Sequence, residues 1–276
     1  VAATVAICAR AGIAIVPQGG NTGMCGGATP GTQGRSIVIS LERMRGIREV
    51  DPANSTMTVD AGCPLAAVQE AASAIGKLFP LSLGSEGTCQ IGGNIATNAG
   101  GHQVLRHGMM RDQVLGLEAV LADGTVISAM NRLLKNNSGY DLKQLFVGAE
   151  GTLGVVTRAV LRLRPPAIRR ETVLCALGDY AGAVALLGRL DRALPGQLGA
   201  FELMWGEFLA AAAALPGASS PFATPPLAAL VEVEGQADGA LAAALESCLA
   251  DGIISDAVVA QSERDRQRLW AVRDAI

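Results

Sequence analysis

The first half of the chain alternates short apolar runs with glycine and proline. Residues 1–11 show helical apolar spacing that ends at Gly12, as glycine commonly does just past a helix. Ile13–Val16 is a short apolar run that ends at Pro17, which predicts a buried strand. A helix is predicted over residues 63–76, with a proline in its opening turn. The remaining runs predict strands at Ser36–Ser40, Ser55–Asp60, Val114–Leu121, Thr125–Ser128 and Gly154–Leu163.

The second half has a different pattern, and the change comes at Pro165-Pro166. Strand-like and helix-like segments alternate there, which favours an α+β sandwich with helices on one face of the sheet. The predicted strands are Thr172–Leu177, Ala200–Met204, Leu227–Glu234 and Ala257–Ala260. The predicted helices are Tyr180–Ala193, a segment ending at Leu215, Asp238–Ala250 and Glu263–Ala275. We therefore place the domain boundary at the proline pair, with domains at residues 1–166 and 167–276.

Composition narrows the classes of protein that the chain can represent. Half of the residues are apolar and 17% are charged, so the chain can bury a large core and is not disordered. A net charge of −3 gives no basic surplus for binding nucleic acid. No apolar run approaches the roughly 18 residues of a membrane span. Six scattered cysteines without a C-x-x-C pair, and only two histidines, disfavour a zinc site or disulfide scaffold and favour a reducing, cytoplasmic compartment.

Glycine is concentrated in the first domain, where 24 of the 34 glycines lie within residues 1–165. Residues 18–34 follow a predicted strand and contain seven glycines but no lysine or arginine. Successive glycines let backbone N–H groups converge on an anion, and Asn21 and Thr22 add side-chain donors. The G-x-G-x-x-G fingerprint is absent, and Gly76-Lys77 lacks the rest of a P-loop. The tract favours a diphosphate held by backbone dipoles, with a glycine-rich surface loop as the alternative.

A second tract of small residues covers positions 80–101. Small residues occupy nearly every position from 92 to 101. Such a stretch lets a flat ring system lie on the backbone, with threonine and asparagine side chains as hydrogen-bond partners. Taken alone, the tract also fits tight packing of turns.

Three motifs occur in order along the chain, and they are PQGGNTGM at 17–24, IGGNIATNAGG at 91–101 and NNSGYDLKQLFVGAEGTLGVVT at 136–157. Together they resemble the flavin-binding domain of FAD enzymes of the vanillyl-alcohol-oxidase type. Within that group the resemblance is greatest to the D-2-hydroxy-acid dehydrogenases, first those acting on 2-hydroxyglutarate and then those acting on D-lactate or glycolate. It covers essentially the whole chain. It implies an α+β fold, with a two-subdomain FAD-binding domain followed by part of a ferredoxin-like α/β substrate (cap) domain.

The resemblance also implies which residues contact FAD. In the family the first loop holds the FAD diphosphate, and the other two tracts complete the pocket. The matching positions are Gly19, Gly20, Asn21, Thr22, Gly23 and Met24 in the first loop, Gly84, Thr88, Cys89, Gly92, Gly93, Thr97, Asn98 and Gly100 in the second tract, and Glu150, Gly151, Thr152, Leu153, Gly154, Val155 and Val156 in the third. Some relatives attach flavin through a histidine or cysteine. His102 and His107 lie outside the first loop, and Cys25 lies just past its contacting run, so we expect non-covalent FAD.

The tail of the chain resembles the substrate side of the same family. Residues 268–273 match a Trp-x-x-Arg element whose arginine binds the substrate carboxylate, so the resemblance assigns this role to Arg273. The alternative is a solvated helix face, because other charged residues crowd the segment. In relatives the catalytic base and the ligands of a divalent metal follow this element, so we assign no catalytic or metal residue within this span. For His102 and His107 we expect packing or hydrogen bonding.

The implied function is an FAD-dependent oxidoreductase that oxidises a D-2-hydroxy acid, similar to 2-hydroxyglutarate, to the 2-oxo acid by hydride transfer to flavin N5. D-lactate or glycolate oxidation is the first alternative. A non-catalytic flavin-binding or electron-transfer subunit, and a glycine-rich module for another ligand, are alternatives of other classes. The expected partner is a small hydroxy acid, while the electron acceptor is not identified and a homodimer stays open. We expect the native protein to extend beyond both ends of this span.

Overall fold

The computed structural model describes residues 1–32, 34–215, 220–223, 225–235 and 239–275, so Asp238 of a predicted helix lies outside the described residues. The chain forms two compact units. Unit 1 comprises Val1–Gly101 and Gly108–Pro166, and unit 2 comprises His102–His107 and Ala167–Ile276. The larger segment of unit 2 therefore begins directly after the proline pair. Its smaller segment, residues 102–107, was placed in the first domain by the sequence analysis.

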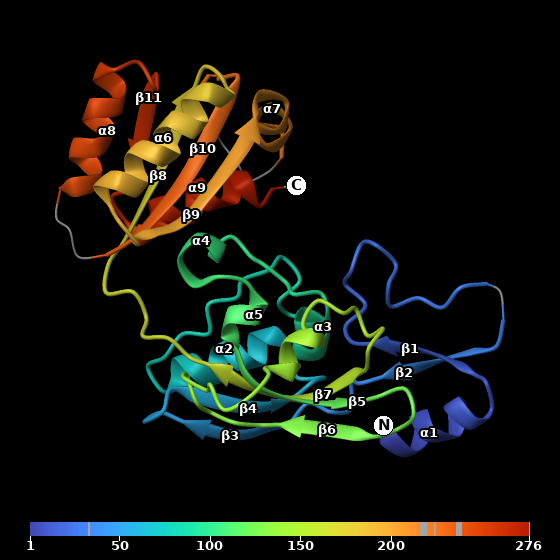
Figure 1. The fold of residues 1–276 in the computed structure, drawn as a ribbon. Helices are drawn as coiled ribbons and strands as arrows, with labels where there is room; N and C mark the ends of the chain where they lie inside the picture. The colour runs from blue at the N-terminus through green and yellow to red at the C-terminus, as the bar shows by residue number, and fades with distance from the viewer. Residues whose placement is uncertain (33, 216–219, 224, 236–238, 276) are drawn as a thin grey trace. The chain divides into compact units, whose positions relative to one another are not determined.

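Unit 1 is built on a five-stranded antiparallel sheet with the strand order β3-β4-β7-β5-β6 (Figure 1). These strands are β3 (Ile47–Asp51), β4 (Thr56–Asp60), β5 (Val114–Val120), β6 (Val126–Ala129) and β7 (Val155–Arg162). A separate parallel pair, β1 (Ala14–Gln18) and β2 (Ser36–Ser40), follows α1 (Ala2–Arg10). The other helices of the unit are α2 (Leu65–Ala74), α3 (Ile91–Ala96), α5 (Met110–Gln113) and the 3-10 turn η1 (Leu142–Leu145).

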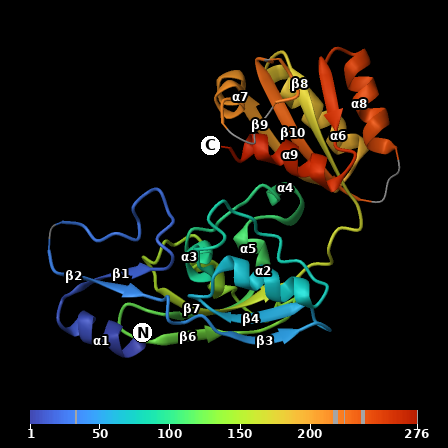
Figure 2. The same cartoon turned by 180° about the vertical axis from the view of Figure 1, so that it is seen from behind.

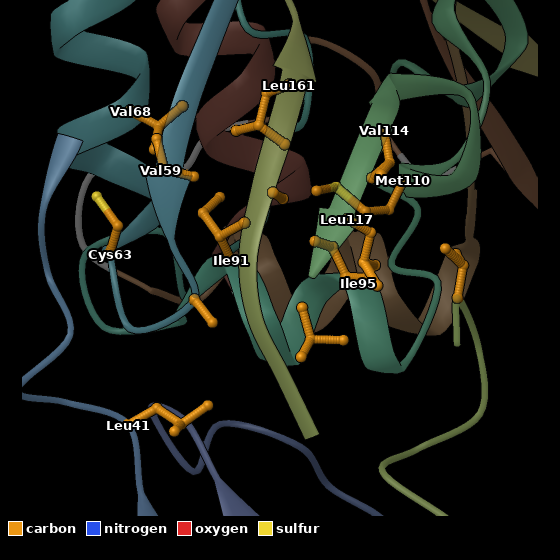
Figure 3. Close-up of a cluster of buried hydrophobic side chains, with 14 of the residues drawn as sticks. Leu41, Val59, Cys63, Val68, Ile91, Ile95, Met110, Val114, Leu117 and Leu161 are labelled. Atoms are coloured by element: carbon orange, nitrogen blue, oxygen red, sulfur yellow. The ribbon is translucent and has the colours of Figure 1, made fainter. Parts of the chain in front are cut away.

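The core of unit 1 lies between one face of this sheet and its helices. Figure 3 shows side chains of β4, β5 and β7 pointing toward those of α2, α3 and α5. Fully buried examples are Val59 on β4, Leu161 on β7, Val68 on α2, and Ile91 and Ile95 on α3. Burying a side chain of this size contributes about 1.5–3 kcal/mol relative to leaving it in water. The core therefore fixes α3, and with it the second motif, against the sheet.

Three elements of unit 1 differ from the sequence prediction. The strand predicted at Ile13–Val16 runs through Pro17 to Gln18 and is half-buried, because the sheet it joins has only two strands. Residues 91–96 are a helix despite two glycines, because Ile91 and Ile95 are drawn into the core. Strand β3 was not predicted, since three of its five residues are charged.

Unit 2 contains a four-stranded antiparallel sheet with the order β11-β8-β10-β9. Its strands are β8 (Arg170–Leu177), β9 (Leu198–Trp205), β10 (Leu227–Glu234) and β11 (Asp256–Val259). Its helices are α4 (Val104–His107), α6 (Tyr180–Ala193), α7 (Gly206–Ala213), α8 (Ala240–Ala250) and α9 (Glu263–Arg273). The path β8-α6-β9-β10-α8-β11, interrupted by α7, has the strand order of a ferredoxin-like unit.

Helices cover both faces of this sheet, so the prediction of helices on one face is wrong. One cluster of buried side chains joins α6 and α8 to the sheet, and another joins α7 and α9 to it. Figures 1 and 2 show the two pairs from opposite sides. The reason lies in β10, where all eight residues are buried. A strand without an exposed face needs cover on both sides.

Residues His102–His107 belong to unit 2 because a buried carboxylate holds them there. Glu234, at the end of β10, is 1% exposed. Its carboxylate accepts from Arg170 Nε at 3.0 Å and lies 3.0 Å from Arg106 Nε. Gln103 Nε2 lies 3.5 Å from the same carboxylate, and Arg106 Nη1 donates to the carbonyl oxygen of Gly196 at 2.6 Å. The segment that directly follows the second motif is therefore fixed by unit 2.

Candidate functional site

The three glycine-rich motifs meet around one cavity in unit 1. It has a volume of about 50 Å³ and takes lining residues from every motif. These are Pro17, Gln18 and Gly19 from the first, Gly92, Gly93 and Ala96 from the second, and Glu150, Gly151, Gly154, Val155 and Val156 from the third. A wider cavity of about 620 Å³, lined mainly by apolar residues, shares Pro17, Gly151, Gly154 and Val155 with it. The two cavities therefore adjoin and provide a narrow part rich in glycine and a wide apolar part.

Other predicted contact residues do not line the narrow cavity. Residues 21–24 are exposed, and so are Gly84, Thr88, Thr97 and Gly100. Glu150 is also exposed, but it does line the narrow cavity. Gly20 is half-buried and lies against the second motif, because a Cβ on it would stand 2.0 Å from the carbonyl oxygen of Thr88. The glycine at position 20 is therefore required by packing inside the protein, and it lets the first loop touch the second tract.

Gly93 has no such internal reason to be glycine. Gly93 lies in α3 and lines the narrow cavity. A Cβ on it would meet no atom within 4 Å. Glycine in a helix interior costs about 1 kcal/mol relative to alanine. Gly23 and Gly84 face open space in the same way. The packing of the protein does not require glycine at position 93, and a methyl group there would enter the cavity. This arrangement fits a ligand that binds close to the backbone.

Backbone strain is concentrated in the motifs. Among the described residues, the non-glycine residues with positive φ include Asn21 at 52°, Asn98 at 48° and Glu150 at 52°, one in each motif. Such left-handed conformations cost about 1 kcal/mol or more and persist where the surrounding structure imposes them. The fourth such residue among those described, Ser55 at 53°, precedes β4, so three of the four lie in the motifs and Glu150 also lines the narrow cavity.

Several predicted contact residues use their side chains inside the protein. Thr97 Oγ1 donates to the carbonyl oxygen of Gly93 at 2.9 Å, and Asn98 Oδ1 accepts from the backbone N–H of Arg111 at 2.9 Å. Cys89 is 2% exposed and packs in the hydrophobic core. These side chains therefore stabilise the tract itself, and none of the three residues lines the narrow cavity.

Two buried polar side chains of the second tract escaped the sequence analysis. Gln90 is 6% exposed and Asn94 is 4% exposed, and Gln90 Oε1 and Asn94 Nδ2 have no hydrogen-bond partner. Buried polar atoms without partners are rare in proteins, and a ligand that binds beside them can satisfy them. Gln90 Oε1 also lies 3.4 Å from the position of a Cβ on Gly19, and so faces the first loop. In a helix, residues at i and i+4 lie on the same face, so a prediction of helix here would have placed Gln90 and Asn94 side by side.

Arg273 lies at the C-terminal end of α9 and is paired with two carboxylates. Its Nε and Nη2 lie 2.9 and 2.8 Å from Oε2 of Glu202, a residue of β9. Its Nη1 donates to Asp274 Oδ1 at 3.1 Å. Burial opposes the charged form, but the hydrogen bonds and charges of Glu202 and Asp274 outweigh it and raise the pKa of Arg273. The guanidinium is therefore held on the surface of unit 2, 39% exposed.

Both histidines are engaged with unit 2. The ring of His102 lies 4.5 Å from that of Trp270 on α9, and Trp270 Nε1 donates to the buried carboxylate of Glu232 at 3.0 Å. Burial lowers the pKa of His102 and outweighs the nearby Glu232 and Glu202, so the imidazole is neutral at pH 7. His107 Nε2 lies 3.5 Å from Glu234 Oε2. In this structure the two side chains pack or pair within unit 2.

Two further features bear on cofactors and membranes. Among the described residues, no group of three or more His, Cys, Asp and Glu side chains is placed to hold a metal ion. In the same part of the chain, no helix combines the length and the apolar character needed to cross a bilayer.

Comparison with known proteins identifies two family domains in this chain. Residues 1–129 match the FAD binding domain family, and residues 167–276 match the C-terminal domain of FAD linked oxidases. The chain is 42% identical to the mitochondrial D-2-hydroxyglutarate dehydrogenase of Bos taurus over 98% of its own length and 50% of the relative's. It is 35% identical to a putative mitochondrial D-lactate dehydrogenase of Schizosaccharomyces pombe, over 98% of this chain and 52% of that one.

The fold has relatives among solved structures. An alkyldihydroxyacetonephosphate synthase structure superposes with a TM-score of 0.76 at 21% sequence identity, over 100% of this chain and 52% of the other. The chain thus spans about half the length of the curated relatives it matches. The two family matches and the mixed helix and sheet fold lead to one conclusion. The chain contains an FAD binding domain followed by the C-terminal domain of FAD linked oxidases, and it shares the fold of the solved synthase.

Proposed function

We propose that this protein is an FAD-dependent dehydrogenase that oxidises a D-2-hydroxy acid of the 2-hydroxyglutarate type to the 2-oxo acid. The observation that carries the proposal is the hollow at Gly93, where three motifs meet and no side chain of the protein fills the space. The hydroxy acid is supported by the relatives, which are named as dehydrogenases of D-2-hydroxyglutarate and D-lactate.

The cofactor is held, in this proposal, by backbone more than by charged side chains. The backbone N–H groups of residues 19–24, of which residues 21–24 are exposed, receive the diphosphate, with Asn21 and Thr22 as further donors. The wide apolar cavity suits an aromatic ring of FAD. The unpaired atoms of Gln90 and Asn94 in the second tract offer hydrogen bonds to another part of the cofactor. When bound, FAD supplies the hydride acceptor for oxidation of the alcohol.

Arg273 binds the substrate carboxylate in this proposal. A planar guanidinium recognises a carboxylate through paired N–H donors, and Arg273 is held at the surface of unit 2 with part of its fork exposed. The same contact serves D-lactate and glycolate, which keeps them as the second candidate substrates. One relative named as a putative D-lactate dehydrogenase favours that alternative specifically.

Anaerobic mixing of the full-length protein with a panel of D- and L-2-hydroxy acids tests the reaction. We expect D-2-hydroxyglutarate to bleach the visible absorbance of the oxidised flavin, because the cofactor accepts the hydride, and the L-enantiomers to leave it unchanged. Fastest reduction by D-lactate or glycolate would select the alternative substrate. A yellow protein that no hydroxy acid reduces would contradict the proposal and favour a flavin-binding subunit without catalysis.

We also propose that FAD is bound without a covalent link. The histidines lie in unit 2, and Cys25 is exposed one residue past the predicted contact run. Acid denaturation of the full-length protein should therefore release FAD into the supernatant. Flavin that stays with the precipitated chain would overturn this part of the proposal, whatever the substrate tests show.

A further inference from the structure

Two carboxylates contact Arg273, and they do so in different ways. Glu202 on β9 uses a single oxygen, Oε2, for both Nε and Nη2, and its side chain is 24% exposed. Asp274 pairs only with Nη1, and its side chain is 58% exposed. Glu202 is therefore a fixed partner supplied by the sheet, while Asp274 is a partner at the surface that water reaches.

The guanidinium of Arg273 has N–H donors that neither carboxylate uses. A guanidinium carries five N–H donors. Glu202 takes one on Nε and one on Nη2, and Asp274 takes one on Nη1. One N–H remains on each terminal nitrogen, and two such donors are what a substrate carboxylate engages in paired fashion. Because Glu202 binds two nitrogens at one edge, the direction of those remaining donors is fixed.

The charges set a condition on substrate binding. Arg273 with Glu202 and Asp274 sums to one excess negative charge, and an anionic substrate is repelled by such a group. Loss of the contact with Glu202 would free two nitrogens of the guanidinium, Nε and Nη2, from their fixed orientation. Asp274 is the more exposed of the two and holds Arg273 through one nitrogen only, so it is the weaker of the two partners.

The other arginines of α9 do not offer this arrangement. Arg266 lies between Glu232 and Glu263, with contacts at 3.2 Å and 2.7 Å, and it is the less exposed guanidinium at 25%. Arg268 is 61% exposed and lies 3.8 Å from Asp265, and Arg264 is exposed. Among the described arginines of the helix, Arg273 combines a fixed partner from the sheet with a displaceable one at the surface.

We propose that Glu202 is a positioning residue that orients Arg273 for the substrate carboxylate, and that Asp274 competes with the substrate for the same guanidinium. The proposal rests on the proposed function, because it assumes that Arg273 binds the hydroxy acid. It assigns opposite effects to two carboxylates on one arginine. A merely structural role for both would give them effects of the same sign.

The test uses the full-length, FAD-loaded protein and four variants, Glu202→Ala, Glu202→Gln, Asp274→Asn and Glu263→Gln. We measure kcat and KM for the best hydroxy acid, and the Kd of the corresponding 2-oxo acid by titrating the absorbance of the bound flavin. Glu202→Ala should raise KM and Kd by about tenfold with kcat changed less than about threefold, the size expected for losing one oriented charged contact. Glu202→Gln keeps an acceptor for Arg273 and should recover part of the loss.

Asp274→Asn should change both constants in the opposite direction, lowering KM and Kd by about twofold to threefold because a surface competitor is worth less than about 1 kcal/mol. Glu263→Gln is the matched control, since it breaks an ion pair of Arg266 on the same helix and should leave both constants unchanged.

An unchanged KM in both Glu202 variants, or a rise in KM for Asp274→Asn, would overturn the proposal. Should Glu202→Ala fail to fold, Glu202→Gln still decides. If no hydroxy acid reduces the wild-type flavin, the proposed function fails; if the wild type is reduced and the variants do not separate, only this inference fails.

Discussion

Gly92 and Gly93 are neighbours in α3, yet they are glycines for different reasons. A Cβ on Gly92 would lie 2.8 Å from Cβ of Ala61, whereas one on Gly93 would lie in open space beside the narrow cavity. The first glycine is required by the protein's own packing. The proposed function attributes the second to a cofactor that approaches the helix. This pair lets folding and cofactor binding be tested one residue apart.

Gly93→Ala should therefore weaken FAD binding without harming the fold. Alanine at this helical position removes a cost of up to about 1 kcal/mol, while its methyl group occupies the hollow. We expect the melting temperature of the flavin-free protein to stay the same or rise, and the Kd for FAD to rise by about tenfold or more. The control Gly92→Ala should lower the melting temperature of the flavin-free protein. An unchanged Kd in Gly93→Ala would place the cofactor elsewhere.

Cysteine reactivity tests the first loop. Cys25 is exposed and the other five cysteines are buried. Burial, reinforced by neighbouring charge, raises the pKa of Cys63 to about 11 and that of Cys175 to about 12, so both are protonated thiols at pH 7.5 and poor nucleophiles. Within this span, iodoacetamide should modify the native protein at Cys25 alone, as read by peptide mass spectrometry. Bound FAD should slow that reaction, and equal rates with and without FAD would argue against contact at residues 19–24.

The sequence identifies the motifs, but the roles of single side chains are visible only in the fold. Gly19, Gly93 and Val155, which were predicted to contact FAD, line the narrow cavity, and the contact itself stays a prediction. The sequence could not show that Thr97 and Asn98 satisfy the backbone of their own tract, because those partners are set by the fold. Gln90 and Asn94 were missed for the same reason, since burial without a partner is visible only in three dimensions.

At the scale of elements, the local sequence pattern predicts a helix or strand correctly where that element has a regular apolar face. The helix at Tyr180–Ala193 was predicted with the boundaries that α6 has, because its apolar residues keep helical spacing and Asp179 caps it through the N–H of Gly182. Helix α3 and strand β3 were missed because tertiary contacts override weak local preference. The two-sided cover of the unit 2 sheet follows from β10, whose continuous burial the alternation of elements did not reveal.

The buried carboxylate of Glu234 makes an element-scale prediction about residues 102–107. Burial alone would raise its pKa, but the hydrogen bond from His107 and the charges of Arg170 and Arg106 outweigh burial and lower it. A carboxyl with a lowered folded-state pKa stabilises the fold above its ordinary pKa, and that stability is lost as pH falls through the folded value. Glu234→Gln should cost about 2 kcal/mol at pH 7, at the low end for a buried ion pair because both arginines are partly exposed.

Urea unfolding at pH 7 and in steps below pH 5 measures this effect, with hydrogen exchange of residues 102–107 as a local readout. The difference between wild type and Glu234→Gln should shrink as pH falls, and exchange in the segment should quicken in the variant at pH 7. Glu246→Gln, an exposed carboxylate on α8, is the control. A difference that is independent of pH would contradict the role assigned to the carboxylate.

At the scale of the whole molecule, the residues of the proposed function fall in both units. Unit 1 brings the three motifs to one cavity, and unit 2 holds the arginine and the segment that continues the second motif. The proline pair made the change of pattern visible in the sequence, but nothing local indicated that residues 102–107 fold with residues 167–276. That placement depends on Glu234, more than a hundred residues away, and long-range ion pairs leave no periodic signal in a sequence.

The claim on which the account depends is that unit 1 binds FAD through backbone at three motifs. Titration of FAD into flavin-free full-length protein, followed by quenching of flavin fluorescence, tests it most directly. The account predicts saturation at one FAD per chain, with a Kd of about 1 μM or lower, a range in which about 8 kcal/mol of binding free energy is gained. A folded protein that leaves FAD fluorescence unchanged at all concentrations would contradict the claim.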